Sequence, residues 1–342
     1  MIELLGLILV SFFVTSFLLV PFIDLLFHLK RKSKLNISTD NLSVSKTDAA
    51  TPIHNKLLAG KDIDTPVGGG ILVIMVVVTL SLATFLLTRH TINSQILVLI
   101  FTILSFGFIG LLDDLKKIFT SFSGKYAGIR GRYLLLLQLI FAVTIAFMLY
   151  FAVGLNNIFV PVVGNIILGW WYIPLAAFAI VSFANAYNIS DGLDGLSSGL
   201  LTICLFAFLA LASSVLNQHL VIFVGVWIGA LIAYLYFNVY PARVYLGDAG
   251  AYGFGATLAV IGLLTGKILG LGVIGGVYVV IIMSSLLQIL SKKILKRKIL
   301  PIAPIHMYFK YLGWEEPKIV VRFWLAGAIL AIFGLWLALL SS

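Results

Sequence analysis

The sequence predicts an all-α integral membrane protein with about ten transmembrane helices. Two observations lead to this prediction. Of the 342 residues, 61% are hydrophobic and only 11% are charged. Apolar stretches of about 20 residues also recur along the whole chain, and each can cross a bilayer as a helix. Since the mean hydropathy is +1.12, an ordinary soluble domain is excluded, and we expect one integral-membrane domain over residues 1–342.

The apolar stretches place the expected spans, with ends that composition fixes only to within a few residues. Cys204, the single cysteine, falls inside one of them, so we expect no disulfide within the chain and interpret Cys204 as a packing residue. In chain order the expected spans are 4–27, 67–88, 96–112, 134–153, 168–184, 197–213, 220–237, 252–265, 268–290 and 319–340.

The basic residues predict the orientation of these spans. Of the 23 Lys and Arg residues, only Arg89 and Lys267 fall outside one set of alternate connections and the residues beside them. The positive-inside rule places that set in the cytoplasm and both termini outside. Because topology then explains the net charge of +10, we expect no nucleic-acid partner. The set comprises the connections 28–66, 113–133, 185–196, 238–251 and 291–318; of these, 185–196 holds no basic residue, and 28–66 is polar and expected to be partly mobile.

Acidic residues gather on the same predicted face. The short cytoplasmic connections hold five of them next to span ends, and the outer face has none beyond Glu3 at the N-terminus. Charged groups at a membrane edge are costly and are a functional-site hypothesis by default. We therefore expect an active-site cleft at the cytoplasmic membrane surface, built around Asp113, Asp114, Asp191, Asp194 and Asp248.

Asp113 and Asp114 follow directly on the expected span 96–112. At that place they would meet the partial negative charge of a helix C-terminus, which repels carboxylates. Lys116 and Lys117 come next and can relieve part of the repulsion. A solvated helix end with local ion pairs is the alternative interpretation.

Two further connections are rich in polar groups. "NAYNISDGLDGLSSG" holds Asn188, Asp191 and Asp194, and a binding site competes there with simple N-capping of the next helix. "YFNVYPARVYLGDAG" holds Asn238 and Asp248, and Asp248 too could be a cap. Carboxylate oxygens from separate connections suit Mg²⁺, which usually takes one or two carboxylates together with substrate phosphates.

Two weaker signals lie at the ends of the long connections. "TPVGGG" (65–70) leads into a span, and its glycines could permit close backbone approach or present free N–H groups to an anion, unless it is a plain junction. His306 lies in the last connection, where a lone histidine is more often structural than catalytic; here it shares a face with acids and cations.

Five motifs in order resemble the polyprenyl-phosphate N-acetylhexosamine-1-phosphate transferase superfamily, and nearly the whole chain takes part. They are "TPVGGG", "GLLDDLKKI", "NISDGLDGL", "FNVYPARVYLGDAG" and "APIHMYFKYLGWEEPKIVVRFW". The last is most similar to the phospho-N-acetylmuramoyl-pentapeptide transferase branch. The resemblance implies ten transmembrane helices, a homodimer in the bacterial cytoplasmic membrane, Mg²⁺ as cofactor, and transfer of phospho-MurNAc-pentapeptide from UDP-MurNAc-pentapeptide to undecaprenyl phosphate on the cytoplasmic face. The products would be lipid I and UMP.

The resemblance also implies roles for single residues. Asp248 matches the metal ligand, Asp113 the carboxylate that activates the lipid phosphate, and Asp114 its catalytic partner; His306 is the fourth catalytic candidate. Nucleotide and sugar contacts are implied for Asn188, Asp191, Asp194 and Asn238, uracil stacking for Tyr245, and phosphate contacts for Lys61, Lys116 and Lys125.

The last connection, 291–318, departs from the family pattern. The family has three consecutive histidines followed by Phe-Glu, whereas this chain has His306, Met307 and Tyr308, then Phe309 and Lys310. Because this loop distinguishes the muramoyl branch from its relatives, transfer of GlcNAc-1-phosphate from UDP-GlcNAc is the alternative activity. A transporter is the alternative from another class, since intramembrane acids and Gly-broken helices also mark transport pathways.

Overall fold

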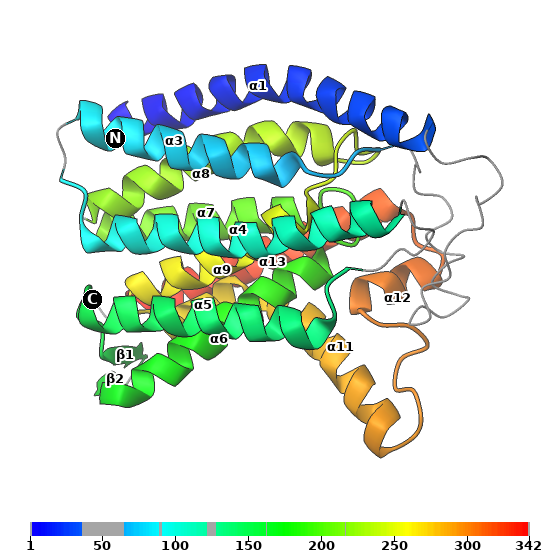
Figure 1. Cartoon of the computed structure of the whole chain (residues 1–342). Coiled ribbons are helices and arrows are strands. Elements are labelled where there is room, and N and C mark those ends of the chain that lie inside the picture. The colour runs from blue at the N-terminus through cyan, green and yellow to red at the C-terminus, as the bar shows by residue number, and fades with distance from the viewer. Residues whose placement is uncertain are drawn as a thin grey trace.

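The computed structural model describes residues 2–35, 65–88, 91–121, 128–161, 163–215 and 217–340. It is a bundle of helices with one small antiparallel hairpin (Figure 1). Ten helices in these ranges are long and apolar enough to span a membrane, which confirms the predicted all-α polytopic fold. In chain order the elements are α1 (Ile2–Leu35), α3 (Gly69–Leu87), α4 (Ser94–Ser121), α5 (Gly131–Phe151), β1 (Asn157–Val160), β2 (Gly164–Ile167), η2 (Gly169–Trp171), α6 (Tyr172–Ser190), α7 (Leu196–Ser214), α8 (Gln218–Asn238), α9 (Gly247–Leu264), α10 (Ile268–Ile274), α11 (Gly276–Ile294), α12 (Ile305–Tyr311) and α13 (Glu316–Leu339).

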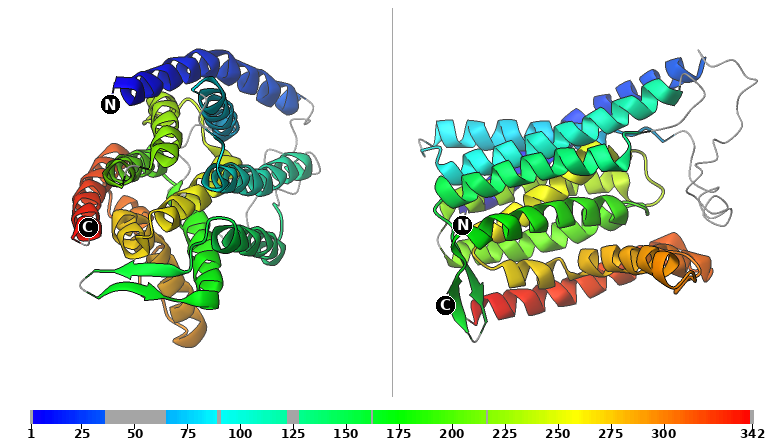
Figure 2. Two further views of the ribbon diagram at one scale, coloured as in Figure 1. Left: turned by 90° about the vertical axis from the view of Figure 1, so that its left-hand side faces the viewer. Right: turned by 60° about the horizontal axis from the view of Figure 1, so that its bottom comes forward.

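Helix α9 is the centre of the bundle. All its residues from Ala249 to Leu264 are buried, and α3, α4, α6 and α10 pack around it (Figure 2). A helix that is apolar on every side is expected in such a position. Its Gly and Ala residues allow neighbouring backbones to come close. The first turn of α9 is in contact with α3, α4 and α6.

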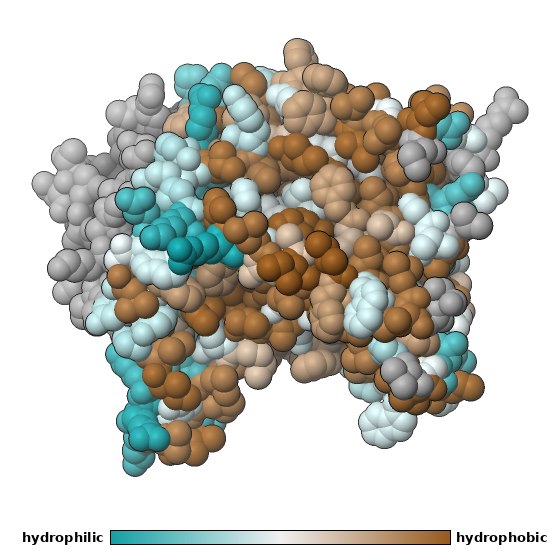
Figure 3. All heavy atoms as spheres, turned by 180° about the vertical axis from the view of Figure 1, so that it is seen from behind, coloured by the Kyte–Doolittle hydropathy of each residue, from teal (hydrophilic) through white to brown (hydrophobic). Residues whose placement is uncertain are grey.

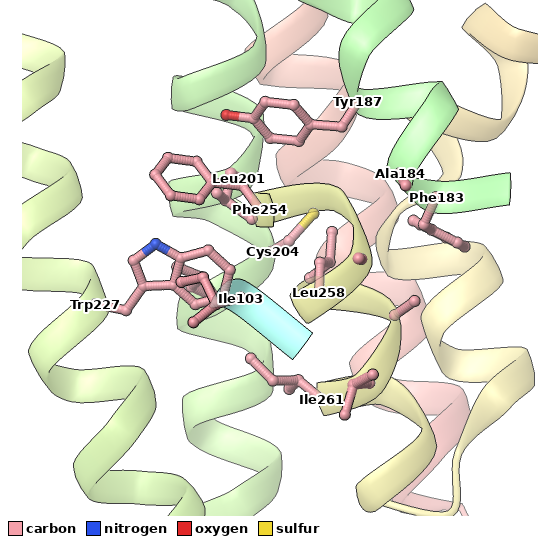
Figure 4. Packing of buried hydrophobic residues seen from close by; sticks show 14 of the residues in the cluster. Ile103, Phe183, Ala184, Tyr187, Leu201, Cys204, Trp227, Phe254, Leu258 and Ile261 are labelled. Atoms are coloured by element: carbon pink, nitrogen blue, oxygen red, sulfur yellow. The ribbon is translucent and has the colours of Figure 1, made fainter. Parts of the chain in front are cut away.

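Aromatic contacts join α9 to the helices on either side. The ring of Phe254 lies edge-on to Trp227 of α8 and to Tyr187 of α6, with centroid distances of 5.4 and 6.0 Å (Figure 4). Cys204 of α7 is buried in the same cluster, which agrees with its interpretation as a packing residue.

The outer surface of the bundle is apolar. From behind, a broad hydrophobic belt covers the middle of the molecule and hydrophilic residues gather towards its ends (Figure 3). Large exposed side chains come from several helices, among them Phe17, Phe178 and Ile332. A soluble monomer rarely exposes a contiguous apolar surface of this extent. The protein is a multi-pass membrane protein whose outer side chains face lipid.

Both ends of the chain lie at the end of the bundle that carries the β1–β2 hairpin (Figure 1). The opposite end carries α12 and the last turns of α4 and α11 (Figure 1). An even number of spans requires this arrangement. The assignment of the α12 end to the cytoplasm rests on the positive-inside rule.

Several element ends differ from the sequence prediction. Helix α4 continues to Ser121 instead of ending at 112, and α9 begins at Gly247 instead of 252. Hydropathy misses these turns because Asp113, Asp114 and Asp248 bind partners within the protein and do not face lipid. The expected span 268–290 is two helices that meet at Gly275, which packs closely against Phe183. The short hairpin and α12 were not expected.

Candidate active site

The ends of α4 and α6 and the start of α9 bring polar side chains together. Asp113 and Asp114 lie in the last third of α4, Asp248 in the first turn of α9, and Asn188 near the end of α6. The Asn188 side chain donates from Nδ2 to Asp248 Oδ1 at 3.0 Å. The structure thus gathers four of the residues that the sequence assigns to catalysis or substrate binding.

Lys117 is the cation of this cluster. Its Nζ donates to Asp248 Oδ2 and lies 2.8 Å from Asp113 Oδ2, so one ammonium bridges carboxylates of α4 and α9. Asp113 and Lys117 face the same side of α4 because residues four apart do so in a helix. Lys116, which the sequence favoured, points about 100° away around the helix and is exposed. Its phosphate-binding role stays a prediction.

The other oxygen of Asp113 is also bound within the protein. Asp113 Oδ1 accepts a hydrogen bond from the backbone N–H of Ile129, which lies two residues before α5. Asp113 is nearly fully buried, and both its oxygens have a donor. Such a carboxylate is held in one orientation.

Asp114 connects α4 to the start of α9. Its Oδ2 accepts from the backbone N–H of Ala249 at 3.2 Å. Helix N-termini leave their first N–H groups unpaired and favour negative charge. Gly110 makes the approach possible, because a Cβ at this position would lie 2.1 Å from the carbonyl oxygen of Asp248.

The expected repulsion at a helix C-terminus is not found. Asp113 and Asp114 lie within α4, about two turns before its last residue, Ser121. They meet Lys117 and the positive N-terminal end of α9 instead. The prediction was wrong because it ended the helix with its apolar run.

The capping alternatives are also wrong. The N-cap of α9 is Leu246 and that of α7 is Gly195, and neither receives a side-chain cap hydrogen bond. The two carboxylate oxygens of Asp248 accept hydrogen bonds from Lys117 and Asn188 instead. N-capping therefore accounts for none of the acids in these two connections.

The loop between α6 and α7 forms the next part of the site. Asp191 is the C-cap of α6, one turn after Asn188, and its Oδ1 accepts from the hydroxyl of Ser197. His306 of α12 packs against the same loop, since a Cβ on Gly192 would lie 2.8 Å from His306 Nε2. The structure thus brings His306 to Gly192, the residue that follows Asp191.

Asp194, from the same loop, is bound into the protein. Its backbone N–H donates to Glu316 Oε1 at 2.7 Å, and its Oδ2 accepts from the N–H of Ala242 at 3.0 Å. Glu316 also accepts from Lys310 Nζ at 2.7 Å. Glu316 is not among the predicted site residues, although it belongs to the last of the five motifs.

Asn238 and Tyr245 shape the connection before α9. Asn238 is buried; its Oδ1 accepts from Ser198 Oγ and its Nδ2 donates to the carbonyl oxygen of Val244, both at 3.1 Å. The backbone of Tyr245 pairs with the segment entering α3 through Pro66. Asn238 thus has a clear structural task, and the nucleotide contacts expected of both side chains stay predictions.

The glycines of "TPVGGG" serve close packing and not anion binding. The N–H groups of Gly68 and Gly69 donate to the carbonyl oxygen of Tyr245, and that of Gly70 donates to Leu246. A Cβ on Gly70 would lie 2.5 Å from Cα of Gly250. Because the N–H groups of all three glycines are already bonded within the protein, the anion-binding alternative is wrong. The close backbone approach that was expected of these glycines is confirmed.

Two predicted phosphate contacts, Lys61 and Lys125, lie outside the described residues. Next to the cluster, an apolar pocket of ≈ 180 Å³ lies between α3 and α4 and reaches Ala249 of α9. Its walls include Ile74, Leu104 and Phe108, side chains that suit hydrocarbon and offer nothing to a charged group.

A divalent cation has donors of the right kind at Asp248. Within the described ranges no group of three His, Cys, Asp or Glu residues could hold a metal. Magnesium does not need one, since it is bound by one or two carboxylates and completes its shell with water and phosphate oxygens. Asp248, with Asp113 and the Asn188 side chain nearby, supplies hard oxygen donors, and the Lys117 ammonium occupies the place between the two carboxylates.

The bundle and this site define a multi-pass membrane enzyme whose polar centre lies at one end of its helices. Residues 96–266 match the glycosyl transferase family 4 model. Curated relatives named phospho-N-acetylmuramoyl-pentapeptide-transferase include that of Oceanobacillus iheyensis, 34% identical over 81% of this chain and 85% of the relative. The Bacillus subtilis protein of that name is 33% identical (80% and 83%), and that of Syntrophus aciditrophicus is 36% identical (79% and 79%). The chain belongs to the phospho-N-acetylmuramoyl-pentapeptide-transferase family.

Proposed function

We propose that this membrane transferase moves phospho-MurNAc-pentapeptide from UDP-MurNAc-pentapeptide to undecaprenyl phosphate, giving lipid I and UMP. The observation that carries the proposal is the cluster of Asp113, Asp248 and Lys117 at one end of a membrane-embedded bundle, in a chain of this family. The apolar pocket beside Ala249 supports a lipid substrate.

Charge repulsion is the main obstacle to this reaction, because both substrates are phosphates. Phosphoryl transfer is catalysed mostly by positioning and by cations near the phosphate oxygens. Lys117 is the described cation closest to the paired carboxylates, and its Nζ can turn from them to a phosphate oxygen. Its role is to neutralise the attacking and departing phosphates.

Magnesium is the second cation of the proposal. Asp248 would hold it, with Asp113 and the amide of Asn188 beside it, and the ion would neutralise the diphosphate as a Lewis acid. Lys117 and a bound Mg²⁺ would together bring three positive charges against the two carboxylates of Asp113 and Asp248, so the site would offer net positive charge to the substrate phosphates.

Asp113 suits an orienting role better than that of a nucleophile. A phosphate monoester is already largely ionised near neutral pH, so a base has little proton to remove. Both oxygens of Asp113 accept hydrogen bonds, from Lys117 and from Ile129, which lowers their nucleophilicity. Direct attack of the lipid phosphate is therefore the favoured route, and a covalent aspartyl phosphate is the rival.

The alternatives have less support. The curated relatives carry the muramoyl name, which argues against UDP-GlcNAc as the donor. The site lies at helix ends and not at mid-span, where transporters place theirs. The further parts of the proposal are a bacterial cytoplasmic membrane, a site on its cytoplasmic face and a homodimer.

Release of UMP tests the proposal directly. Purified protein is given UDP-MurNAc-pentapeptide or UDP-GlcNAc, with Mg²⁺ and with or without undecaprenyl phosphate; Asp248→Asn is the control variant. We expect UMP only with the lipid phosphate and Mg²⁺, and fastest from the muramoyl donor. Faster release from UDP-GlcNAc would assign the alternative activity, while solute uptake into proteoliposomes without UMP release would indicate a transporter.

A further inference from the structure

The α6–α7 loop and the last connection meet at one buried carboxylate at the α12 end of the bundle, and Asp194 joins them to a third connection, the one before α9. Glu316 opens α13 and is almost fully buried, yet its two oxygens serve different parts of the chain. Oε1 accepts from the backbone N–H of Asp194, and Oε2 accepts from Nζ of Lys310, each at 2.7 Å. We call Lys310, Glu316, Asp194 and Ala242 the carboxylate junction.

The junction extends from α12 to α1. Asp194 Oδ2 holds the N–H of Ala242, whose carbonyl oxygen accepts from Thr65 Oγ1 at 3.2 Å. Lys30 at the end of the α1 span then donates to the carbonyl oxygen of Thr65 at 2.7 Å. A continuous series of side-chain-to-backbone bonds therefore connects the last loop with the loop before α9.

The junction lies next to residues to which the proposed function assigns contacts with the sugar nucleotide. Asp191 and Gly192 are at most three residues from Asp194, and His306 is four residues from Lys310 and packs on Gly192. Glu316 itself does not contact a substrate in this proposal, because it is buried and both its oxygens accept hydrogen bonds from the protein. Its effect on the reaction must pass through the groups that it holds.

We propose that Glu316 is a positioning residue: by bonding the Asp194 N–H and Lys310 together, it fixes the 191–195 loop against α12 and so sets the binding site for the sugar nucleotide. The inference rests on the proposed function. Lys310 orients the carboxylate, and the Asp194 bond does the positioning. The Asp113–Lys117–Asp248 cluster lies on other helices, α4 and α9, so the loop should not affect the chemical step or the binding of the lipid phosphate.

The expected signature is a separation of kinetic constants. Glu316→Ala removes both bonds and should raise the KM for UDP-MurNAc-pentapeptide at least tenfold. The kcat at saturation and the KM for undecaprenyl phosphate should stay within threefold. Glu316→Gln keeps an oxygen for the Asp194 N–H and should restore most of the affinity. Glu315→Ala, the same change at the exposed neighbouring acid, is the matched control and should have no effect.

The experiment measures UMP release for the wild type and these variants, with binding of UDP-MurNAc-pentapeptide measured separately by calorimetry. Lys310→Met, which leaves the Asp194 bond in place, gives a milder second test if Glu316→Ala does not fold, and should raise the same KM about threefold. If the wild type is active and Glu316→Ala has an unchanged KM for the donor, the positioning role is overturned. If Glu316→Ala does not fold, an unchanged KM in Lys310→Met overturns it instead. Equal losses in Glu316→Ala and Glu316→Gln that affect kcat and both KM values would also overturn it. A wild type that releases no UMP would instead refute the proposed function.

Discussion

Replacement of Lys117 by Met tests the electrostatic part of the site most directly. The change removes the ammonium that lies 2.8 Å from Asp113 Oδ2 and that also contacts Asp248, and it keeps the length of the side chain. A unit charge about 4 Å from a phosphate oxygen contributes about 4 kcal/mol at the effective dielectric near a protein surface. Because 27% of the Lys117 side chain is exposed, solvent screens part of this energy.

We therefore expect Lys117→Met to lower kcat/KM about 100-fold, which is about 2.7 kcal/mol of transition-state stabilisation. The assay is UMP release at varied donor concentration and saturating lipid phosphate. The variant also leaves Asp113 and Asp248 facing each other without their cation. Its thermal stability in detergent should consequently fall without Mg²⁺ and rise more than that of the wild type when Mg²⁺ is added.

The same substitution at Lys116 separates the structural from the sequence-based assignment. Lys116→Met removes an equal charge from the exposed side of the same turn of α4, and its loss should be at least tenfold smaller. If Lys116→Met proved the more damaging of the two, or if Lys117→Met kept activity within threefold while folded, the ammonium bridge would not be the catalytic cation.

Four further outcomes are expected. Asp248→Asn should abolish Mg²⁺-dependent turnover in a folded protein, because an amide is a poor substitute for a charged ligand; near-normal activity would place the metal elsewhere. Asp113→Asn should lower kcat more than donor affinity, and loss of binding with a normal kcat would make Asp113 a substrate-capture residue. His306→Ala should lower kcat/KM at least tenfold, about 1.4 kcal/mol, and a neutral effect would leave the ring with packing only. Cysteines introduced into 28–66 and 291–318 should react with impermeant reagents only from the cytoplasm, against a background in which Cys204 is buried; labelling from outside would reverse the topology.

The fold could be predicted because the bilayer sets the length of each apolar run. The errors arise where polar residues are buried in protein and not exposed to lipid. Helix α4 continues past its apolar run because Asp113 and Lys117 pair one turn apart, and α9 starts early because Asp114 accepts from its first turn. Hydropathy counts such residues as loop, although their partners make helix the favoured state.

The site could be predicted by residue type and place in the chain, but not by orientation. The choice between Lys116 and Lys117 depends on a rotation of about 100° around α4, and no local pattern shows where α9 will lie. Glu316 was missed for a related reason. Its partners, Lys310 and the N–H of Asp194, are 6 and 122 residues away, and the second is a backbone group that a sequence motif cannot reveal.

The contacts of the last loop show how the chain accommodates its departures from the family pattern. Met307, in place of a histidine of the family pattern, is buried in the apolar core, and Tyr308 stacks on Tyr311 at a centroid distance of 6.5 Å. Lys310, in place of the family's Glu, pairs with Glu316, so the reversed charge is neutralised within the protein. His306 lies against the loop that holds Asp191 and Gly192. The substitutions thus fall where packing or an internal ion pair accommodates them, and the one retained imidazole is the one that contacts the loop holding Asp191.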